Sequence, residues 1–429
     1  MKTLEQIAAE LQGYDPHALP AELVGAFLER LVEPLPETET VALPQALQRV
    51  LARDVISPMD VPPHDNAAMD GYALRGGDLR AEGDTTLRVL GTCYAGGQGW
   101  TQPVPAGACV RIMTGAVMPA DCDTVVPLEF VADGDGGDGT ITVPAGVVRP
   151  GDHRRLRGED LAAGRPALHA GQRLGPAALG LVASLGIGEV TVRRRARVAY
   201  FSTGDEVLSL GEPWRPGAIY DSNRHTITAL LCRLGVDVLD FGVVRDEPAA
   251  LEAAFRQAAA QADAVITSGG VSMGEADHTK AMMRRLGEVA FWRIAMRPGR
   301  PMAVGRLQAG SRSTLLFGLP GNPVAAMVTF LMFVRPALLR LMGATAAAPI
   351  PLRARSTEPM RKKPGRTEYQ RGIVTRAADG TLLVRTTGQQ GSGVLRSMVE
   401  ANGLIVLHHH QGSVAPGDEV DVLMFEGLI

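Results

Sequence analysis

Alternating strand-like and helix-like segments over residues 195–342 constrain the fold of this chain more than any other feature of its sequence. Short apolar runs such as Arg197–Phe201 and Ala264–Thr267 are separated by helical periodicity over Asn223–Leu234 and Pro248–Ala262. The other expected elements are strands at Val236–Val244, Val289–Met296 and Thr314–Phe317 and helices at Asp277–Leu286 and Pro323–Met342. Strands that alternate with helices form βαβ units, so we expect a central parallel α/β sandwich domain with both sheet faces covered.

The flanking segments differ from this core in composition. Apolar residues near the N-terminus repeat at helical spacing, whereas residues 61–147 are rich in Gly, Val, Thr and Pro and show short alternating stretches. Residues 351–429 also alternate and have no helical pattern. The expected layout is a helical and extended domain over 1–60 with 148–194, an inserted small β domain over 61–147, the α/β domain over 195–342 and a C-terminal β barrel over 343–429.

Charge and composition exclude several classes of protein. The net charge is −3 and supplies no cationic field for nucleic acid or a membrane surface. The apolar run Val324–Val334 is too short to span a bilayer and is expected to be a buried helix. No lysine follows a glycine, which excludes a Walker A phosphate loop. The four cysteines form no CxxC pair and are expected to be reduced. Since no signal peptide is expected either, we predict a cytoplasmic protein. His408–His410 is expected to end a strand, since three consecutive strand residues cannot face one metal.

Polar clusters follow the strands of the expected sheet. Ser202–Glu206 follows the first strand, Asp246 and Glu247 the second, and Ser268–Asp277 the third. Arg297–Arg300 and Gly318–Pro323 follow the next two. Because ligands of open α/β sheets bind at the carboxyl ends of the strands, these loops predict a binding site.

The loop Ser268–Asp277 is the most informative of these segments. It has three glycines and two serines before a helix, which lets backbone N–H groups approach an anion. Carboxylates beside a phosphate would repel it unless a divalent cation lay between them. Asp246 and Asp277, with Glu206, are therefore candidate Mg²⁺ ligands. Asp277 is equally well placed to cap the helix that follows.

Three arginines supply a second element of the predicted site. Arg293, Arg297 and Arg300 lie close together on an extended segment. Guanidinium groups bind phosphates well, so this cluster suits a highly anionic substrate. The alternative is a solvated basic edge strand.

Nine motifs, in order along nearly the whole chain, resemble the bacterial MoeA proteins; plant molybdenum insertases and the E domain of gephyrin carry related signatures. The motifs are PPHDNAAMDGYAL (62–74), RIMTGA (111–116), RRLRGED (154–160), STGDE (202–206), IYDSNR (219–224), TSGGVSMGEADHTK (267–280), RPGRP (297–301), GLPGNPV (318–324) and PGRTEYQRG (364–372).

The resemblance implies a function and an assembly. It implies a molybdopterin molybdenumtransferase that binds adenylylated molybdopterin and molybdate, cleaves the molybdopterin–AMP phosphoanhydride with Mg²⁺, and releases molybdenum cofactor and AMP. It also implies an elongated homodimer formed through residues 1–60 with 148–194. The active site would lie between the α/β domain of one subunit and the β domain of the other. Transient contact with the molybdopterin adenylyltransferase or molybdopterin synthase is expected.

The resemblance also assigns roles to residues of this chain. Catalytic positions are Asp70, Thr114, Glu206, Asp246 and Asp277, of which the last three would also hold Mg²⁺. Substrate-binding positions are Ser272, Arg293, Arg297 and Arg300, with Pro320 and Pro323 shaping the adjoining loop. Arg366 and Ser392 would hold molybdate, since an arginine fork and a hydroxyl suit a tetrahedral oxyanion.

Departures from the family pattern leave alternatives open. Positions 293, 297 and 300 are usually lysine in the family, and Ala67 and Ala325 replace serines. Sequence does not distinguish a molybdate-inserting enzyme from a paralogue that inserts tungstate, because molybdate and tungstate are nearly isosteric. A gephyrin-like scaffold without turnover would be expected to carry an extra N-terminal domain and a long linker. The related adenylyltransferase resembles only the α/β domain.

Overall fold

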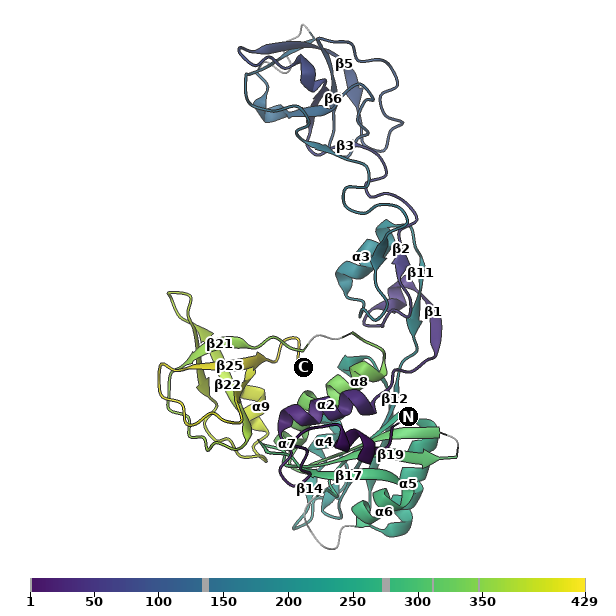
Figure 1. Ribbon diagram of the computed structural model, residues 1–429, viewed down its shortest axis with the longest axis vertical. Helices are drawn as coiled ribbons and strands as arrows, with labels where there is room; N and C mark the ends of the chain where they lie inside the picture. Colours follow the sequence, from purple (N-terminus) through teal and green to yellow (C-terminus); the bar gives the residue numbers. More distant parts are fainter. Residues whose placement is uncertain (1, 133–138, 272–277, 311, 346–347, 429) are drawn as a thin grey trace.

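The computed structural model describes residues 2–132, 139–271, 278–310, 312–345 and 348–428. The molecule is elongated (Figure 1). A small β unit (β3 to β9) lies at one end, and an α/β unit (β12 to β20) lies at the other with a barrel (β21 to β25) beside it. A middle unit, containing β1, β2, β10, β11 and α3, connects the two ends (Figure 1). The predicted class, multidomain α/β plus β, is confirmed.

The α/β unit is built on a six-stranded sheet. Its strands, in spatial order, are β15 (Asp237–Val244), β12 (Arg197–Thr203), β16 (Ala264–Ser268), β20 (Arg312–Leu319), β19 (Pro301–Ala309) and β17 (Gly287–Arg293). The expectation of a wholly parallel sheet is wrong in one respect: β19, which sequence reasoning missed, is antiparallel to both neighbours. The other five strands run in one direction and end at a common edge, which we call the carboxyl edge.

Helices cover both faces of this sheet. One face packs against α1 (Leu4–Ala9), α2 (Ala21–Leu31), α4 (Ser222–Leu234), α7 (Pro323–Thr329) and α8 (Arg335–Leu341). The other packs against α5 (Pro248–Gln261) and α6 (His278–Leu286). Within β12, Val198 and Tyr200 point to the first core and Ala199 and Phe201 to the second, which is the alternation of a strand buried on both sides.

The apolar helix of this unit runs from Pro323 to Leu341 and contains a π-helical turn over Phe330–Val334. Pro336 lies just after this turn and cannot donate a helical hydrogen bond, which accounts for the local widening. Among the described residues this is the one helix long and apolar enough to cross a membrane, with mean hydropathy 1.7 over its most apolar window. However, 78% of that window is buried inside the protein, as expected for a core helix.

The helical spacing near the N-terminus corresponds to α1 and α2. Beyond α2 the chain forms β1 (Thr38–Ala42), a 3₁₀ turn (Leu43–Ala46) and β2 (Val55–Ile56). Strand β1 pairs with β11 (Glu189–Arg193), and β2 pairs with β10 (Pro166–Leu168). With α3 (Pro176–Ser184), these strands enclose the core of the middle unit.

The small β unit holds a five-stranded sheet in the order β7 (Thr124–Pro127), β4 (Gly71–Leu74), β6 (Ala108–Ile112), β5 (Thr85–Cys93) and β8 (Thr140–Val143). A separate pair, β3 (Asn66–Ala67) with β9 (Arg154–Arg155), lies at its base. Short 3₁₀ turns occupy Gly76–Asp78 and Leu128–Phe130. Two apolar cores, one on each side of the sheet, make this unit a packed body of its own.

The C-terminal strands close into a barrel. They are β21 (Leu352–Ser356), β22 (Thr367–Arg376), β23 (Leu382–Thr386), β24 (Gly403–Leu407) and β25 (Glu419–Met424), and each pairs with two others. A short helix, α9 (Arg396–Glu400), was not expected. His408–His410 follows the end of β24, as predicted, and His408 contacts Asp421 at 2.6 Å.

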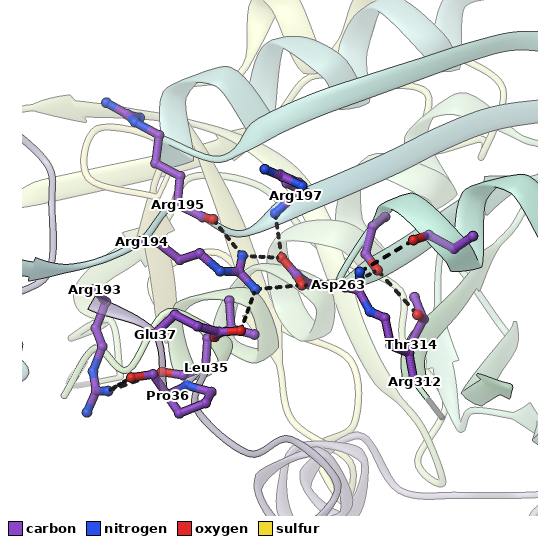
Figure 2. A network of polar contacts seen from close by, with 12 residues as sticks. Leu35, Pro36, Glu37, Arg193, Arg194, Arg195, Arg197, Asp263, Arg312 and Thr314 are labelled. Carbon is purple, nitrogen blue, oxygen red and sulfur yellow. Dashed lines mark hydrogen bonds and ion pairs between the residues drawn. The ribbon is translucent and has the colours of Figure 1, made fainter. Parts of the chain in front are cut away.

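A buried carboxylate ties the α/β unit together at its amino edge (Figure 2). Asp263 is 7% exposed and accepts hydrogen bonds from Arg194 at 2.7 and 2.9 Å, from the Arg197 N–H at 2.8 Å and from Arg312 at 3.2 Å. Burial alone would raise the pKa of Asp263, but the two guanidinium groups and the N–H outweigh it and the pKa is lowered.

Replacing Asp263 by asparagine is therefore expected to lower the free energy of unfolding of the α/β unit by about 2–3 kcal/mol, because Arg194 and Arg312 lose the buried carboxylate that they share. The exposed Asp237→Asn serves as the control. Because the folded-state pKa is lowered, the wild-type advantage is present above about pH 4 and is lost as pH falls through that pKa. Thermal unfolding of the wild type and both variants across acid pH tests this. A difference in unfolding temperature between wild type and Asp263→Asn that grows on acidification would contradict it.

Candidate active site

The loops after the parallel strands meet at the carboxyl edge. Gly269, after β16, donates to the Leu319 carbonyl at the end of β20 (3.2 Å). The Asn223 side-chain amide donates to Ser268 Oγ (2.7 Å) and to the Gly321 carbonyl (2.8 Å). Gly269 also lies close to Thr203. Segments of four motifs, 202–206, 219–224, 267–280 and 318–324, are therefore in contact.

The start of the glycine-rich loop packs closely against Thr203 and Thr279. Gly269 has φ +91°, and a Cβ there would lie 2.5 Å from the Thr203 carbonyl oxygen. Gly270 has φ +64°, and a Cβ there would lie 2.5 Å from Cβ of Thr279 in α6. Only glycine fits both constraints at once. The predicted positions Ser272 and Asp277 lie outside the described residues.

Two predicted carboxylates, Glu206 and Asp246, follow neighbouring strands at this edge. Asp246 is half-buried, and its Oδ1 accepts from the Thr279 hydroxyl (3.3 Å) while its N–H donates to Asp205 Oδ1 (3.3 Å). Glu206 is exposed, lies over Gly204, and accepts at its carbonyl from Ile219, the first residue of β14 (Ile219–Tyr220). In the described ranges, no three His, Cys, Asp or Glu side chains form a metal-binding group.

The three predicted arginines also emerge at the carboxyl edge. Arg293 is half-buried at the end of β17, and its backbone bonds to Pro16 (2.7 Å) and Leu19 (3.0 Å). Arg297 and Arg300 are exposed on the loop that follows. Gly299, between them, has φ +95° and no room for a Cβ beside Thr329 Oγ1 in α7, at 2.5 Å. The loop therefore presents both guanidinium groups while its backbone packs on α7.

The barrel closes this edge within the same chain. Val324, in the first turn of α7, donates its N–H to the Ser392 carbonyl (3.0 Å), and Thr367 donates to the Ala295 carbonyl (2.9 Å). Strand β18 (Met296–Arg297) pairs in parallel with β22. Pro320 is buried before α7, and Pro323 is the first residue of that helix. The contact brings Ser392 to the loop that holds the two prolines.

Two barrel arginines differ in how their charge is balanced. Arg366 donates to the buried carboxylate of Glu368 at 2.8 and 2.6 Å, so its charge is paired. Arg371 is 1% exposed and donates to Ser397 Oγ (2.9 Å) and to the Gly391 carbonyl (3.0 Å), directly before Ser392. No carboxylate of the described residues pairs with it.

Sequence reasoning missed Arg371. Burial, with the nearby charge of Arg297, lowers its pKa to about 10. It is therefore a buried, unneutralised cation beside the loop of Ser392. The signal was present, since PGRTEYQRG contains two arginines, but the motif alone did not show which one faces the loop.

Asp70 and Thr114 form a second predicted cluster. Asp70, directly before β4, accepts at Oδ1 from the Thr114 hydroxyl (2.6 Å) and from its N–H (2.7 Å), and both residues are exposed. These hydrogen bonds hold the pKa of the Asp70 carboxyl below its usual range. Within one chain, however, the small β unit lies at the opposite end of the molecule from the carboxyl edge (Figure 1).

Replacing Thr114 by valine is expected to raise the pKa of Asp70 toward, but not to, its ordinary value. The hydroxyl donor is lost while the backbone donor remains. A ¹³C titration of labelled aspartate carboxyls measures the change, with the exposed Thr86→Val as control. An unchanged pKa of Asp70 in Thr114→Val would show that the hydroxyl does not stabilise the carboxylate.

Comparison with known families agrees with this arrangement. The model of the MoeA N-terminal region (domain I and II) matches residues 20–186, that of the probable molybdopterin binding domain residues 199–340, and that of the MoeA C-terminal region (domain IV) residues 353–425. The class is thus a multidomain protein in which an α/β domain of the molybdopterin-binding type is joined to β domains.

Relatives define the family within that class. A molybdopterin molybdenumtransferase of Haemophilus influenzae is 42% identical over 93% of this chain and 98% of its own length, and one of Nostoc is 37% identical over 90% and 88%. A crystal structure of a molybdopterin biosynthesis MoeA protein from Pyrococcus horikoshii matches with TM-score 0.70 and 30% identity, covering 95% and 99%. The chain belongs to the MoeA family.

Proposed function

We propose that this protein is a molybdopterin molybdenumtransferase, a transferase of molybdenum cofactor biosynthesis that inserts molybdate into adenylylated molybdopterin and releases AMP. One observation carries the proposal: the carboxyl edge gathers a glycine-rich loop, two carboxylates, three arginines and the loop of Ser392. Phosphates suit the arginines and the loop amides, and an oxyanion suits the barrel side of the same edge.

The residues divide by the substrate that they would bind. Arg293, Arg297 and Arg300 hold the phosphates of adenylylated molybdopterin, with Ser272 on the glycine-rich loop. Arg366 and Ser392 hold molybdate, and Arg371 restrains the loop of Ser392 through its hydrogen bond to the Gly391 carbonyl. Pro320 and Pro323 keep the loop between β20 and α7 in the shape that meets Ser392.

Mg²⁺ is a further part of the proposal. Glu206 and Asp246 offer the oxygen ligands that this ion prefers, and Asp277 is the third candidate. Mg²⁺ is commonly held by one or two carboxylates together with waters and substrate phosphates, so a compact three-carboxylate cage is not needed. When bound there, the ion would offset the negative charge of the phosphates during cleavage. Asp246, restrained by Thr279, fixes one ligand position.

A homodimer would bring the Asp70–Thr114 cluster close to the carboxyl edge, from which it is distant within one chain. Residues 1–60 with 148–194 would form the dimer contact, placing Asp70 and Thr114 of the inserted β domain (61–147) over the α/β domain (195–342) of the partner subunit. The lowered pKa of Asp70 favours its ionised form, as expected of a group that orients water or a cation. The protein would act in the cytoplasm, with transient contact to the enzyme that supplies its substrate.

Formation of the product tests this function. Purified protein is incubated with adenylylated molybdopterin, Mg²⁺ and molybdate, and an apo-molybdoenzyme is added to report active cofactor. We expect activity of the reporter only when all components are present. Cofactor formed with tungstate and not molybdate would identify the tungstate-inserting paralogue. No cofactor from folded protein would refute the transferase assignment and favour a binding scaffold.

A further inference from the structure

A cavity lies on the side of the α/β unit away from the carboxyl edge. Its volume is about 190 Å³, which exceeds the roughly 150 Å³ of an engineered cavity that holds benzene. Leu234, the last residue of α4, lines it, and two residues after Gly235 the chain enters β15 at the amino edge of the sheet. The cavity is therefore separate from the candidate active site.

Positive charge dominates the polar lining of this cavity. Arg173, Arg233 and Arg335 line it, and no carboxylate does so among the described residues. Arg173 donates to the carbonyls of Arg233 (3.2 Å) and Leu234 (3.1 Å), and Arg335 donates to the carbonyl of Gly427 (3.0 Å). These carbonyls accept hydrogen bonds from Arg173 and Arg335 but do not cancel the charges of these two residues, neither of which forms an ion pair within the described ranges.

The two half-buried guanidinium groups also disfavour one another. Burial lowers the pKa of Arg173 and of Arg335, and the charge of Arg335 lowers the pKa of Arg173 further. A planar guanidinium has several donors in a fork that matches carboxylate or phosphate oxygens. An oxyanion held by both groups would remove their repulsion and use their remaining donors.

Apart from Gln48, the remaining side chains of the lining are apolar. Leu234, Phe330 and Leu331 are buried core residues whose edges form the wall, and Leu428 closes one side. This wall, and a volume well above the need of an inorganic ion, point to a ligand with an apolar body. We propose that the cavity binds a small organic anion, its phosphate or carboxylate head held by Arg173 and Arg335 and its apolar body on Phe330 and Leu234.

Such a ligand would also contact several units of the chain at once. Gln48 and Arg173 come from the middle unit, Arg335 from α8, and Leu428 from the end of the barrel segment. A bound anion would therefore tie three units of the chain together and raise the temperature of unfolding. This inference is independent of the proposed transferase activity.

Calorimetric titration with phenyl phosphate tests the proposal, with inorganic phosphate and phenol as probes of the head and body alone and phenylacetate as the carboxylate probe. We expect saturable binding of phenyl phosphate or phenylacetate, whichever head the site prefers, and weaker binding of the two fragments. Arg173→Gln and Arg335→Gln should each weaken binding about tenfold or more. Arg80→Gln, at an exposed position of the small β unit, should leave it unchanged.

A second variant keeps the test valid if those arginine variants do not fold. Gln48→Glu places a carboxylate at the cavity, so it should raise the unfolding temperature and weaken binding of the same probe. Absence of saturable binding to wild type would overturn the proposal. So would binding that survives in folded Arg173→Gln and Arg335→Gln, that survives in Gln48→Glu, or that is lost in Arg80→Gln.

Discussion

Replacing Asp246 by asparagine is expected to lower the rate of AMP release from adenylylated molybdopterin by about 100-fold or more, the usual cost of removing a group that stabilises charge in the transition state. Asp246 is held by Thr279 and by the Asp205 carboxylate, so the amide would occupy the same position without the charge. Steady-state AMP release at saturating substrate and varied Mg²⁺ measures the effect.

The neighbouring Glu247→Gln is the matched control. Glu247 precedes α5, its side chain caps nothing, and it is exposed, so its rate should stay within about twofold of wild type, as for surface substitutions. A higher Mg²⁺ requirement in Asp246→Asn would support its role as a ligand. Full activity in Asp246→Asn, or equal loss in both variants, would contradict the assignment.

Mixing two inactive variants is expected to restore activity. In the proposed homodimer each active site takes Asp70 from one subunit and Asp246 from the other. Asp70→Asn and Asp246→Asn should both be inactive alone, yet a mixed dimer has one intact site and one doubly substituted site. After random subunit exchange, half of the dimers are mixed, so the mixture should recover about a quarter of wild-type activity.

Two substitutions from the same cluster provide the control. Glu206→Gln mixed with Asp246→Asn should stay inactive, because both residues lie on one α/β unit and every site carries at least one substitution. Recovery in that control mixture, or none in the first mixture after proven exchange, would refute a site shared between subunits.

Elements with local signals were predictable from the sequence. Helix α4 was expected over Asn223–Leu234 and is observed over Ser222–Leu234. Asp221 caps its start by accepting from the Arg224 N–H (3.0 Å), and Gly235 ends it with φ +85°. Both determinants lie within the helix or beside it.

Elements that depend on distant partners were not predictable. Strand β19 is buried on both faces and contains Arg306, a residue that weakens any apolar pattern. Its guanidinium donates to the carbonyls of Lys2 and Leu31 near the N-terminus, contacts that local sequence cannot reveal. Strand β1 likewise depends on β11, and its own residues are mostly exposed.

The same distinction holds at the site. Motif spacing indicated that Glu206, Asp246 and the arginines follow strand ends, and the parallel direction of those strands brings them to one edge. The contact of Asp70 with Thr114 depends on the order of strands in the small β unit. Arg371 was missed because a charged strand residue suggests exposure, whereas Ser397 and Gly391, far along the chain, bury it.

The most direct test of the transferase assignment is AMP release from adenylylated molybdopterin by the wild-type protein, measured with and without molybdate and Mg²⁺. We expect release that requires Mg²⁺ and is stimulated by molybdate, with cofactor formed in step with AMP. No release by folded, Mg²⁺-supplied protein, or release indifferent to molybdate, would contradict the assignment.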